Sequence, residues 1–322
     1  MNRRQLLGVL CVAPYMNAAV AQPRTALTIG VLTLGVDRGS THLEALRQGM
    51  RQHGYTEGSN VRYEYRFADG HADRLAAMAA ELVRLKVDLI VTESAPAAVA
   101  ASKATKSLPI VMAVASDPVK AGLAASLARP GGNVTGLTIA GAERAAKQVQ
   151  VLKEGLPDAT SVAVIYAPRA NIESDLAEAQ NSARSMSLAL QLFEVSGPHD
   201  FEKTFGAITY AKPSAVMTIG HGMLLGNRRR ITDFCLKAKL PGVFPEREFA
   251  EAGGLMTYGP DLAANFRRVG GYVDRIVKGA QPGDLPVEQP TKWELVVNLR
   301  TAQALGIKLP GAVLVRADEV IQ

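Results

Sequence analysis

The alternation of strand-like and helix-like segments along the chain constrains its fold more than any other feature. An apolar run at 27–32 predicts a buried strand, and Leu43, Leu46 and Met50 follow it at the spacing of one helix face. The same succession recurs later, where a β-prone run at 161–166 precedes a long helical stripe. Repeated strand–helix–strand units predict parallel sheets with helices on both faces. The sequence therefore predicts an α/β fold.

The pattern also divides into two parts. The chain has 322 residues, which suggests about two domains. A helix expected at 119–127 leads into a Pro-Gly turn and a short β-prone run that ends at Thr138. We interpret this passage as a hinge between two Rossmann-like lobes. Too little chain remains after Thr257 for a third lobe, so we expect it to return to the first. The expected boundaries are 25–138 with about 258–290 for lobe 1, and 139–257 with about 291–322 for lobe 2.

The N-terminal segment 1–21 has the features of an export signal. Two arginines precede a short apolar run at 6–12, and Ala19-Val20-Ala21 fits a small-x-small cleavage site before Gln22. The run is too short and broken to span a bilayer, so an uncleaved anchor is the less favoured alternative. The paired arginines fit a Sec-type or a twin-arginine signal equally well. We therefore expect a periplasmic protein whose export route stays open.

Composition argues against several classes of function. Removal of the signal leaves 34 basic against 30 acidic residues, and aromatic residues make up only 5% of the chain, so no nucleic-acid partner is expected. Cys235 is the one cysteine of the mature chain, which excludes an intramolecular disulfide and a Cys/His zinc site. The sequence contains no nucleotide-binding glycine motif, nucleophile elbow or H-x-x-x-H pair. We therefore expect no cofactor, no metal and no enzymatic activity.

The remaining candidates are polar residues that follow predicted strands. Ligands of open α/β sheets bind beyond the carboxyl ends of the strands. By that rule the predicted ligand-binding residues are Thr33, Glu93, Ser94, Ser116, Asp117, Asn171, His221, Glu246 and Tyr258. Ser94, Asp117 and Asn171 have an alternative as helix caps or turn formers. His42 is interpreted as a polar surface residue, and His221 as either a cavity residue or an exposed loop residue.

Several motifs resemble one protein family. The sequence contains SDPVKAGLAASLARPGGNVTGL at 116–137, DLPVEQPTKWELVVNLRTAQALGI at 284–307 and RADEVI at 316–321. Together they are similar to the solute-binding proteins of ABC transporters related to the tryptophan/tyrosine-binding group. The resemblance implies a type I periplasmic-binding-protein fold with three crossovers, a ligand in the cleft between the lobes and an ABC permease as partner. It also strengthens the ligand-binding roles of Ser94, Asp117 and Asn171.

Two departures from the family pattern lie where the ligand is expected. This chain has Glu93 where family members often carry small residues, and Gly220-His221-Gly222 where many carry an acidic-Pro pair. The candidate residues offer both carboxylates and hydrogen-bond donors, which favours an amino acid or a related amphoteric ligand over a neutral sugar. We therefore predict an exported, monomeric solute-binding protein. The alternatives are an enzyme or a ligand sensor on the same scaffold, and a sugar-repressor-type regulator would need a DNA-binding domain before Leu27.

Overall fold

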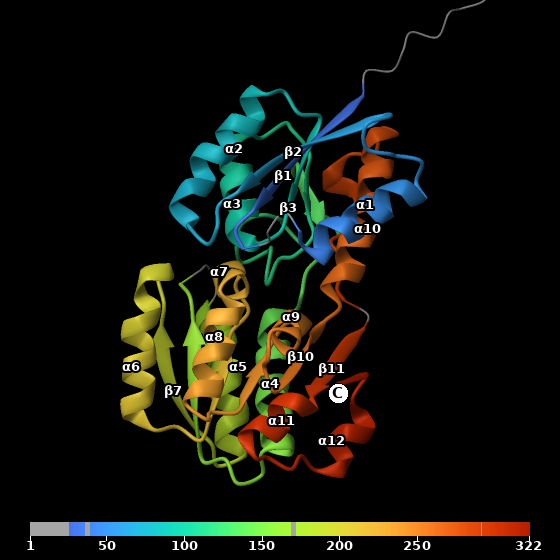
Figure 1. Cartoon of the computed structure of the whole chain (residues 1–322). Helices are drawn as coiled ribbons and strands as arrows, with labels where there is room; N and C mark the ends of the chain where they lie inside the picture. Colours follow the sequence, from blue (N-terminus) through green and yellow to red (C-terminus); the bar gives the residue numbers. More distant parts are fainter. Residues whose placement is uncertain (1–25, 36–38, 169–171, 291) are drawn as a thin grey trace, which may run out of the picture.

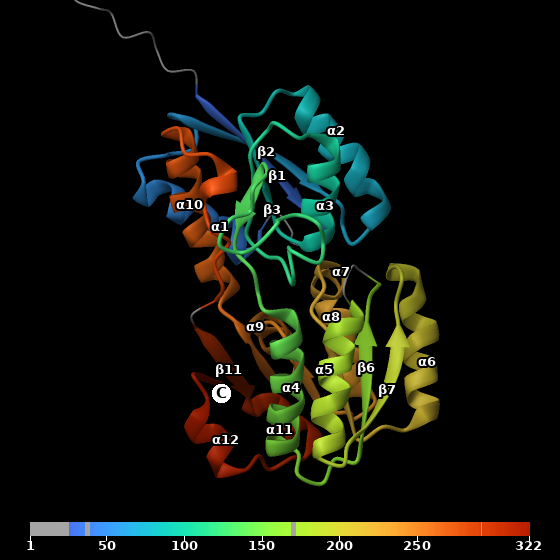
Figure 2. The ribbon, with the colours of Figure 1, turned by 180° about the vertical axis from the view of Figure 1, so that it is seen from behind.

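The computed structural model describes residues 26–322 apart from 36–38, 169–171 and 291. The described chain forms two α/β lobes, each built on its own sheet (Figures 1 and 2). This arrangement confirms the predicted fold class. The expected signal segment 1–21 lies outside the described residues. Within the described part of the chain, no helix has both the length and the apolar character needed to cross a bilayer.

The sheet of lobe 1 is parallel throughout its described strands. In spatial order these are β2 (Val61–Phe67), β1 (Leu27–Thr33), β3 (Leu89–Thr92), β4 (Ile110–Met112) and β5 (Val134–Gly136). Strand β1 is buried on both faces along most of its length, as its continuous apolar run predicts. The strand order reverses between β1 and β3, which is where open α/β sheets hold their ligands.

The sheet of lobe 2 repeats this order and extends it. Its described strands, in spatial order, are β12 (Glu319–Ile321), β11 (Trp293–Asn298), β10 (Met256–Pro260), β9 (Gly242–Phe244), β8 (Ala215–Thr218), β6 (Ser161–Tyr166) and β7 (Ala189–Glu194). Strands β10 and β11 pair antiparallel, and the other neighbours pair parallel. Here the order reverses between β6 and β8, so the two lobes have corresponding positions for a ligand.

Helices cover both faces of each sheet (Figures 1 and 2). Lobe 1 carries α1 (Thr41–Gln52) and α10 (Leu262–Val277) on one face, and α2 (Leu75–Arg84) and α3 (Ala95–Ala104) on the other. Lobe 2 carries α4 (Gly141–Gly155) and α5 (Ile172–Ser185) on one face, and α6 (Phe201–Ala211) and α8 (Arg228–Lys237) on the other. Shorter elements are α7 (Gly222–Gly226), α9 (Arg247–Glu251), α11 (Leu299–Leu305), α12 (Gly311–Arg316), and the 3-10 turns η1 (Ala72–Arg74), η2 (Pro198–Asp200) and η3 (Pro282–Asp284).

The chain passes between the lobes at three places: after β5, between β10 and α10, and between η3 and β11. The first and third passages run side by side. The Thr138 N–H donates to the Glu288 carbonyl at 2.9 Å, and the Glu288 N–H donates to the Gly136 carbonyl at 3.0 Å. A few backbone hydrogen bonds at this position restrain the two segments without an extensive interface, which suits a hinge.

The segment 119–127 does not form the helix that its sequence predicts; it forms successive turns instead. Gly122 adopts a φ of 69°, in the left-handed region that ends a helix. The Leu123 N–H donates back to the Pro118 carbonyl at 2.8 Å, which closes a wide turn. Leu123 and Ala124 are nevertheless buried, so the turns still contribute apolar side chains to the core of lobe 1.

Candidate functional site

The loops at the carboxyl ends of the strands of both lobes enclose a cavity, which we call the inter-lobe cavity. The cavity has an empty volume of about 480 Å³, which includes space open to solvent. The described lining residues of lobe 1 and the hinge are His42, Glu93, Ser94, Ala95, Pro96, Val114, Ala115, Ser116, Ile139 and Leu262, and those of lobe 2 are Gly220, His221, Gly222, Leu225 and Glu246.

Glu93 lies just after β3, at the point where the sheet order of lobe 1 reverses. Its side chain is almost fully buried, and the Leu34 N–H donates to its Oε2 atom at 2.7 Å. Burial raises the pKa of this carboxyl, although the N–H groups of Leu34 and Gly35 act in the opposite direction. The adjacent Ser94 is the N-cap of α3, as predicted, and also lines the cavity.

Glu246 approaches the same cavity from lobe 2, where it follows β9 and precedes α9. Its Oε1 atom lies 3.5 Å from a guanidinium nitrogen of Arg144, which is fully buried on α4. Burial raises the pKa of Glu246 to about 7, with the charge of Arg144 opposing the rise. Gly220 makes room for this arrangement, because a Cβ atom there would lie only 2.2 Å from the guanidinium.

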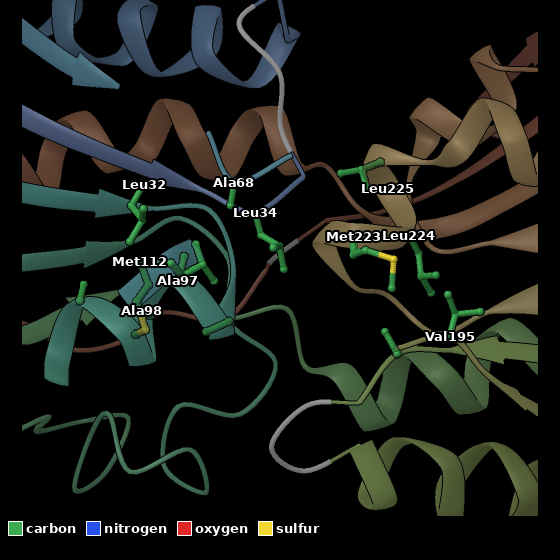
Figure 3. Close-up of a cluster of buried hydrophobic side chains, with 14 of the residues drawn as sticks. Leu32, Leu34, Ala68, Ala97, Ala98, Met112, Val195, Met223, Leu224 and Leu225 are labelled. Carbon is green, nitrogen blue, oxygen red and sulfur yellow. The ribbon is translucent and has the colours of Figure 1, made fainter. Parts of the chain in front are cut away.

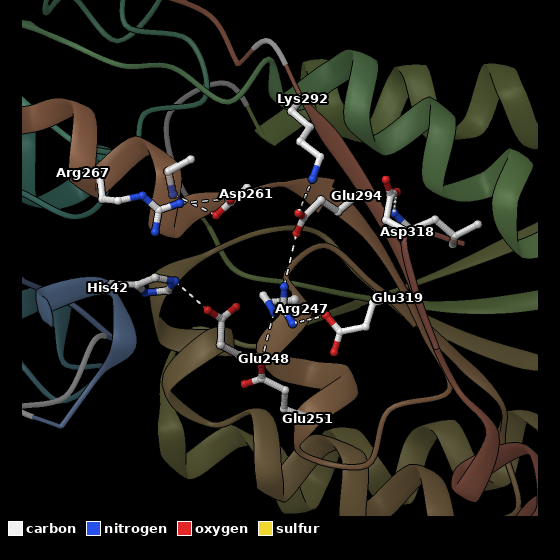
Figure 4. Close-up of polar contacts among 12 residues, drawn as sticks. His42, Arg247, Glu248, Glu251, Asp261, Arg267, Lys292, Glu294, Asp318 and Glu319 are labelled. Carbon is white, nitrogen blue, oxygen red and sulfur yellow. Dashed lines mark hydrogen bonds and ion pairs between the residues drawn. The ribbon is translucent and has the colours of Figure 1, made fainter. Parts of the chain in front are cut away.

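An ion pair connects the lobes beside the cavity (Figure 4). The Nε2 atom of His42, on α1, lies 2.6 Å from the Oε1 atom of Glu248, on α9. The His42 ring also stacks on Phe266, with 5.2 Å between ring centroids. Burial by itself lowers the pKa of His42, but the neighbouring carboxylates, Glu248 first and then Glu93 and Glu246, together outweigh it and the pKa is raised. Burial likewise raises the pKa of Glu248, but His42 outweighs it and that pKa is lowered. Both shifts favour the charged pair.

The lobes also meet through apolar side chains and backbone (Figure 3). Met223, Leu224 and Leu225 on α7 belong to the same buried cluster as Leu34 of lobe 1. The backbones approach closely nearby, since a Cβ atom at Gly35 would lie 1.5 Å from the carbonyl oxygen of Gly222. His221 caps α7, accepting a hydrogen bond at Nδ1 from the Met223 N–H at 3.2 Å, and lines the cavity. The lobes are therefore in direct contact over this edge.

A second cavity adjoins the first and shares Ser116 with it. Asp117 lines this second cavity, together with residues of the hinge and of α5. Its carboxylate accepts a hydrogen bond from the Lys120 N–H at 3.0 Å and lies 3.9 Å from the Lys120 ammonium. Asp117 thus has the turn-forming contact that its sequence context predicts, and about a third of its side chain stays exposed toward the cleft.

Of the nine predicted site residues, the structure places Glu93, Ser94, Ser116, His221 and Glu246 around the inter-lobe cavity. Asp117 is in the adjoining cavity, and Asn171 lies outside the described residues. Thr33 is fully buried at the end of β1 and is not among the described lining residues. Tyr258 is also not among them, because its ring stacks on Trp293 of the neighbouring β11, with 5.8 Å between centroids.

Sequence reasoning missed two residues of this region. The interpretation of His42 as a surface residue is wrong, because it lies between Phe266 of lobe 1 and Glu248 of lobe 2 and is only 2% exposed. Arg144 was not a candidate at all, although it is fully buried next to Glu246. A charged residue within an apolar helical stripe is a signal that could have drawn attention to it. Among the described residues, no group of three or more potential metal ligands comes together.

Comparisons with known proteins agree with this architecture. A model of the family described as ABC transporter substrate binding protein matches residues 36–321. A curated tyrosine-binding protein from Clostridioides difficile (strain R20291) is 25% identical over 266 residues, which span 81% of this chain and 75% of that one. A solved ABC domain from Streptococcus pneumonia, in complex with L-Trp, is 28% identical with a TM-score of 0.82 and covers 91% of this chain and 100% of its own. A conserved domain protein from Vibrio cholerae is 30% identical with a TM-score of 0.84, covering 92% and 99% respectively.

Proposed function

Because the chain belongs to the family of ABC transporter substrate-binding proteins, we propose that it captures an amino acid or a related amphoteric molecule between its lobes and delivers it to an ABC permease. The family consists of binding proteins, so the chain is a binding protein and not an enzyme. The observation that carries the ligand class is the chemistry of the inter-lobe cavity. It combines two buried carboxylates with hydroxyl groups and the start of a helix.

The two kinds of group suit the two ends of an amino acid. Glu93 and Glu246 are acceptors for a protonated amine. The hydroxyl groups of Ser94 and Ser116 are donors for a carboxylate, and the dipole of α3 favours an anion at its N-terminus. The relatives support the proposal, since one is named a tyrosine-binding protein and one was solved with L-Trp. Asp117, in the adjoining cavity, remains a proposed ligand-binding residue, and so does Asn171, which lies outside the described residues.

Capture requires the lobes to separate and close again, because both contribute to the cavity wall. We propose that the two passages near Thr138 and Glu288 act as the hinge, with the lobe boundaries expected from the sequence. The ligand stabilises the closed arrangement by contacting both lobes at once. Small-angle scattering should show a smaller radius of gyration with ligand than without it. An unchanged radius at saturation would contradict hinge closure.

The decisive experiment identifies the ligand. Native mass spectrometry of the purified protein should reveal a co-purified small molecule, and calorimetry against a panel of amino acids should find one that binds with one-to-one stoichiometry. A protein that binds none of the panel would refute the proposed ligand class. We further propose that the protein is exported to the periplasm and acts there as a monomer, which sedimentation of the mature protein can test.

A further inference from the structure

Two buried carboxylates from opposite lobes line the same cavity. Glu93 comes from the β3–α3 loop of lobe 1, and Glu246 comes from the β9–α9 loop of lobe 2. Glu93 is 4% and Glu246 is 5% exposed to solvent, so neither carboxylate is well hydrated. Burial of two carboxylates near each other is costly unless cations or hydrogen-bond donors compensate it. The hydrogen bonds and cations around each carboxylate therefore indicate which groups a ligand has to supply.

Glu93 is partly compensated from within its own lobe. The Leu34 N–H donates to its Oε2 atom at 2.7 Å, and the Gly35 backbone also stabilises the charged form. The nearby cation, His42, already faces the Glu248 carboxylate at 2.6 Å. Glu93 therefore has N–H donors but shares its nearest cation with another acid.

Glu246 is less well compensated. Its Oε1 atom lies 3.5 Å from Arg144, which is beyond a direct hydrogen bond. Its Oε2 atom is buried and has no hydrogen-bond partner among the described residues. A buried carboxylate oxygen normally has a hydrogen-bond partner. Because Glu246 lines the cavity, a donor group of the ligand can supply that partner.

We propose that Glu246, with Glu93 across the cavity, forms the subsite for a protonated amine of the ligand. This inference rests on the proposed function and assigns one end of the ligand to these two residues. An ammonium group supplies donors to both carboxylates and neutralises the charge that the protein leaves buried.

Proton release on binding follows from the same geometry. Burial raises the pKa of both carboxyls, and that of Glu246 reaches about 7. At neutral pH part of the Glu246 population is therefore protonated. An ammonium that contacts Glu246 lowers this pKa, so the carboxyl O–H proton passes to water and then to the buffer while the ligand keeps its own proton. The amount released should be largest below pH 7, between the pKa of Glu246 in the free protein and its lower pKa in the complex, and it should vanish well above pH 7.

The test compares three probes that differ only in their charged ends: L-tryptophan, tryptamine and indolepropionate, with the corresponding tyrosine set measured in parallel. Calorimetry in two buffers of different ionisation enthalpy gives both the affinity and the number of protons released. We expect Glu246→Gln to weaken L-tryptophan or L-tyrosine by about tenfold to a hundredfold, the range for a charged hydrogen bond, and to reduce proton release to the part that Glu93 contributes. Indolepropionate should bind the variant as it binds the wild type.

Controls separate a local effect from loss of folding. Glu93→Gln should weaken the amine-bearing probes in the same selective way. Glu202→Gln, which changes an acid on the exposed surface of α6, should leave all affinities unchanged. Melting curves of each variant report the folded state. A Glu246→Gln protein that loses indolepropionate as strongly as L-tryptophan would have lost the cavity rather than the subsite, and would overturn the assignment.

The three probes also distinguish failure of this inference from failure of the proposed function. Equal binding of L-tryptophan and indolepropionate, with no proton release, would overturn the amine subsite and leave amino-acid binding intact. Binding of tryptamine without L-tryptophan, lost in Glu246→Gln, would support the subsite and overturn the amphoteric ligand class. Binding of none of the probes in either set would overturn both.

Discussion

The ion pair between His42 and Glu248 should stabilise the closed arrangement of the lobes. Each residue belongs to a different lobe, so the pair separates when the lobes open. The side chains are 2% and 12% exposed, which is close to the buried limit, where removal of one partner costs about 3–5 kcal/mol. The relevant reference here is the open protein, in which both groups regain water. The expected loss is therefore nearer that of a charged hydrogen bond, about 2 kcal/mol.

The substitution Glu248→Gln tests this expectation. Glu248 is not among the described residues that line the inter-lobe cavity, so the change alters closure without removing a described ligand contact. A loss of about 2 kcal/mol from the closed state should weaken the ligand by roughly 30-fold, provided that the open state predominates without ligand. Calorimetry with an amino acid that binds the wild type gives the ratio of the two dissociation constants.

The ratio should depend on pH in a defined direction. The pKa of His42 is raised above its ordinary value of 6.5, so its contribution is fully present below about pH 6.5 and is lost as the pH rises through the raised pKa. The pKa of Glu248 is lowered below 4.5, so its contribution is present above about pH 4.5 and is lost as the pH falls through the lowered pKa. The ratio should therefore be largest between these limits and decline toward pH 9.

Glu246 titrates in the same range, since burial raises its pKa to about 7 and the charge of Glu248 adds to that rise, so the variant is compared with the wild type as a ratio at each pH. The matched control is Glu319→Gln, which breaks a 2.5 Å ion pair with Arg247 inside lobe 2 (Figure 4). Both partners of that pair are partly exposed, so the ligand affinity should stay within about twofold of the wild type. A Glu248→Gln ratio near one at pH 6, or one that does not change between pH 6 and pH 9, would refute the reasoning.

Three further predictions concern closure, the edge of the site and export. Gly35→Ala places a Cβ atom 1.5 Å from a carbonyl oxygen of lobe 2, which should prevent the lobes from closing. Small-angle scattering of this variant should therefore show no compaction when ligand is added. The control Gly206→Ala adds a Cβ atom in open space, so its lobes should close as in the wild type. Asp117→Ala and Asn171→Ala should each weaken binding by about 1–3 kcal/mol with little change in melting temperature, and wild-type affinity in both would remove them from the site. N-terminal sequencing of periplasmic protein should begin at Gln22, and an intact N-terminus on cytoplasmic protein would contradict export.

Local sequence patterns determined the fold class and the kind of loop that carries the site. The spacing of apolar residues identifies the buried face of each helix, and continuous apolar runs identify central strands. The carboxyl ends of those strands follow directly, and Glu93, Ser94 and Glu246 were found in that way. Ser94 as a helix cap is equally local, since it depends on residues within one turn. The prediction of a helix at 119–127 was wrong, because Gly122 adopts a left-handed conformation within a wide turn.

Only the tertiary structure decided which of these loops meet and what becomes buried between them. Periodicity reports how a segment packs on its own sheet, and it contains no information about a surface that a distant lobe covers. His42 has the sequence context of an exposed residue and is buried between Phe266 of its own lobe and Glu248 on α9 of lobe 2. Glu93 and Glu246 are far apart in the chain, and their raised pKa values arise from burial in a cavity that neither lobe forms alone. Desolvation and charge pairing depend on distances across the cleft, which the path of the chain through the hinge sets.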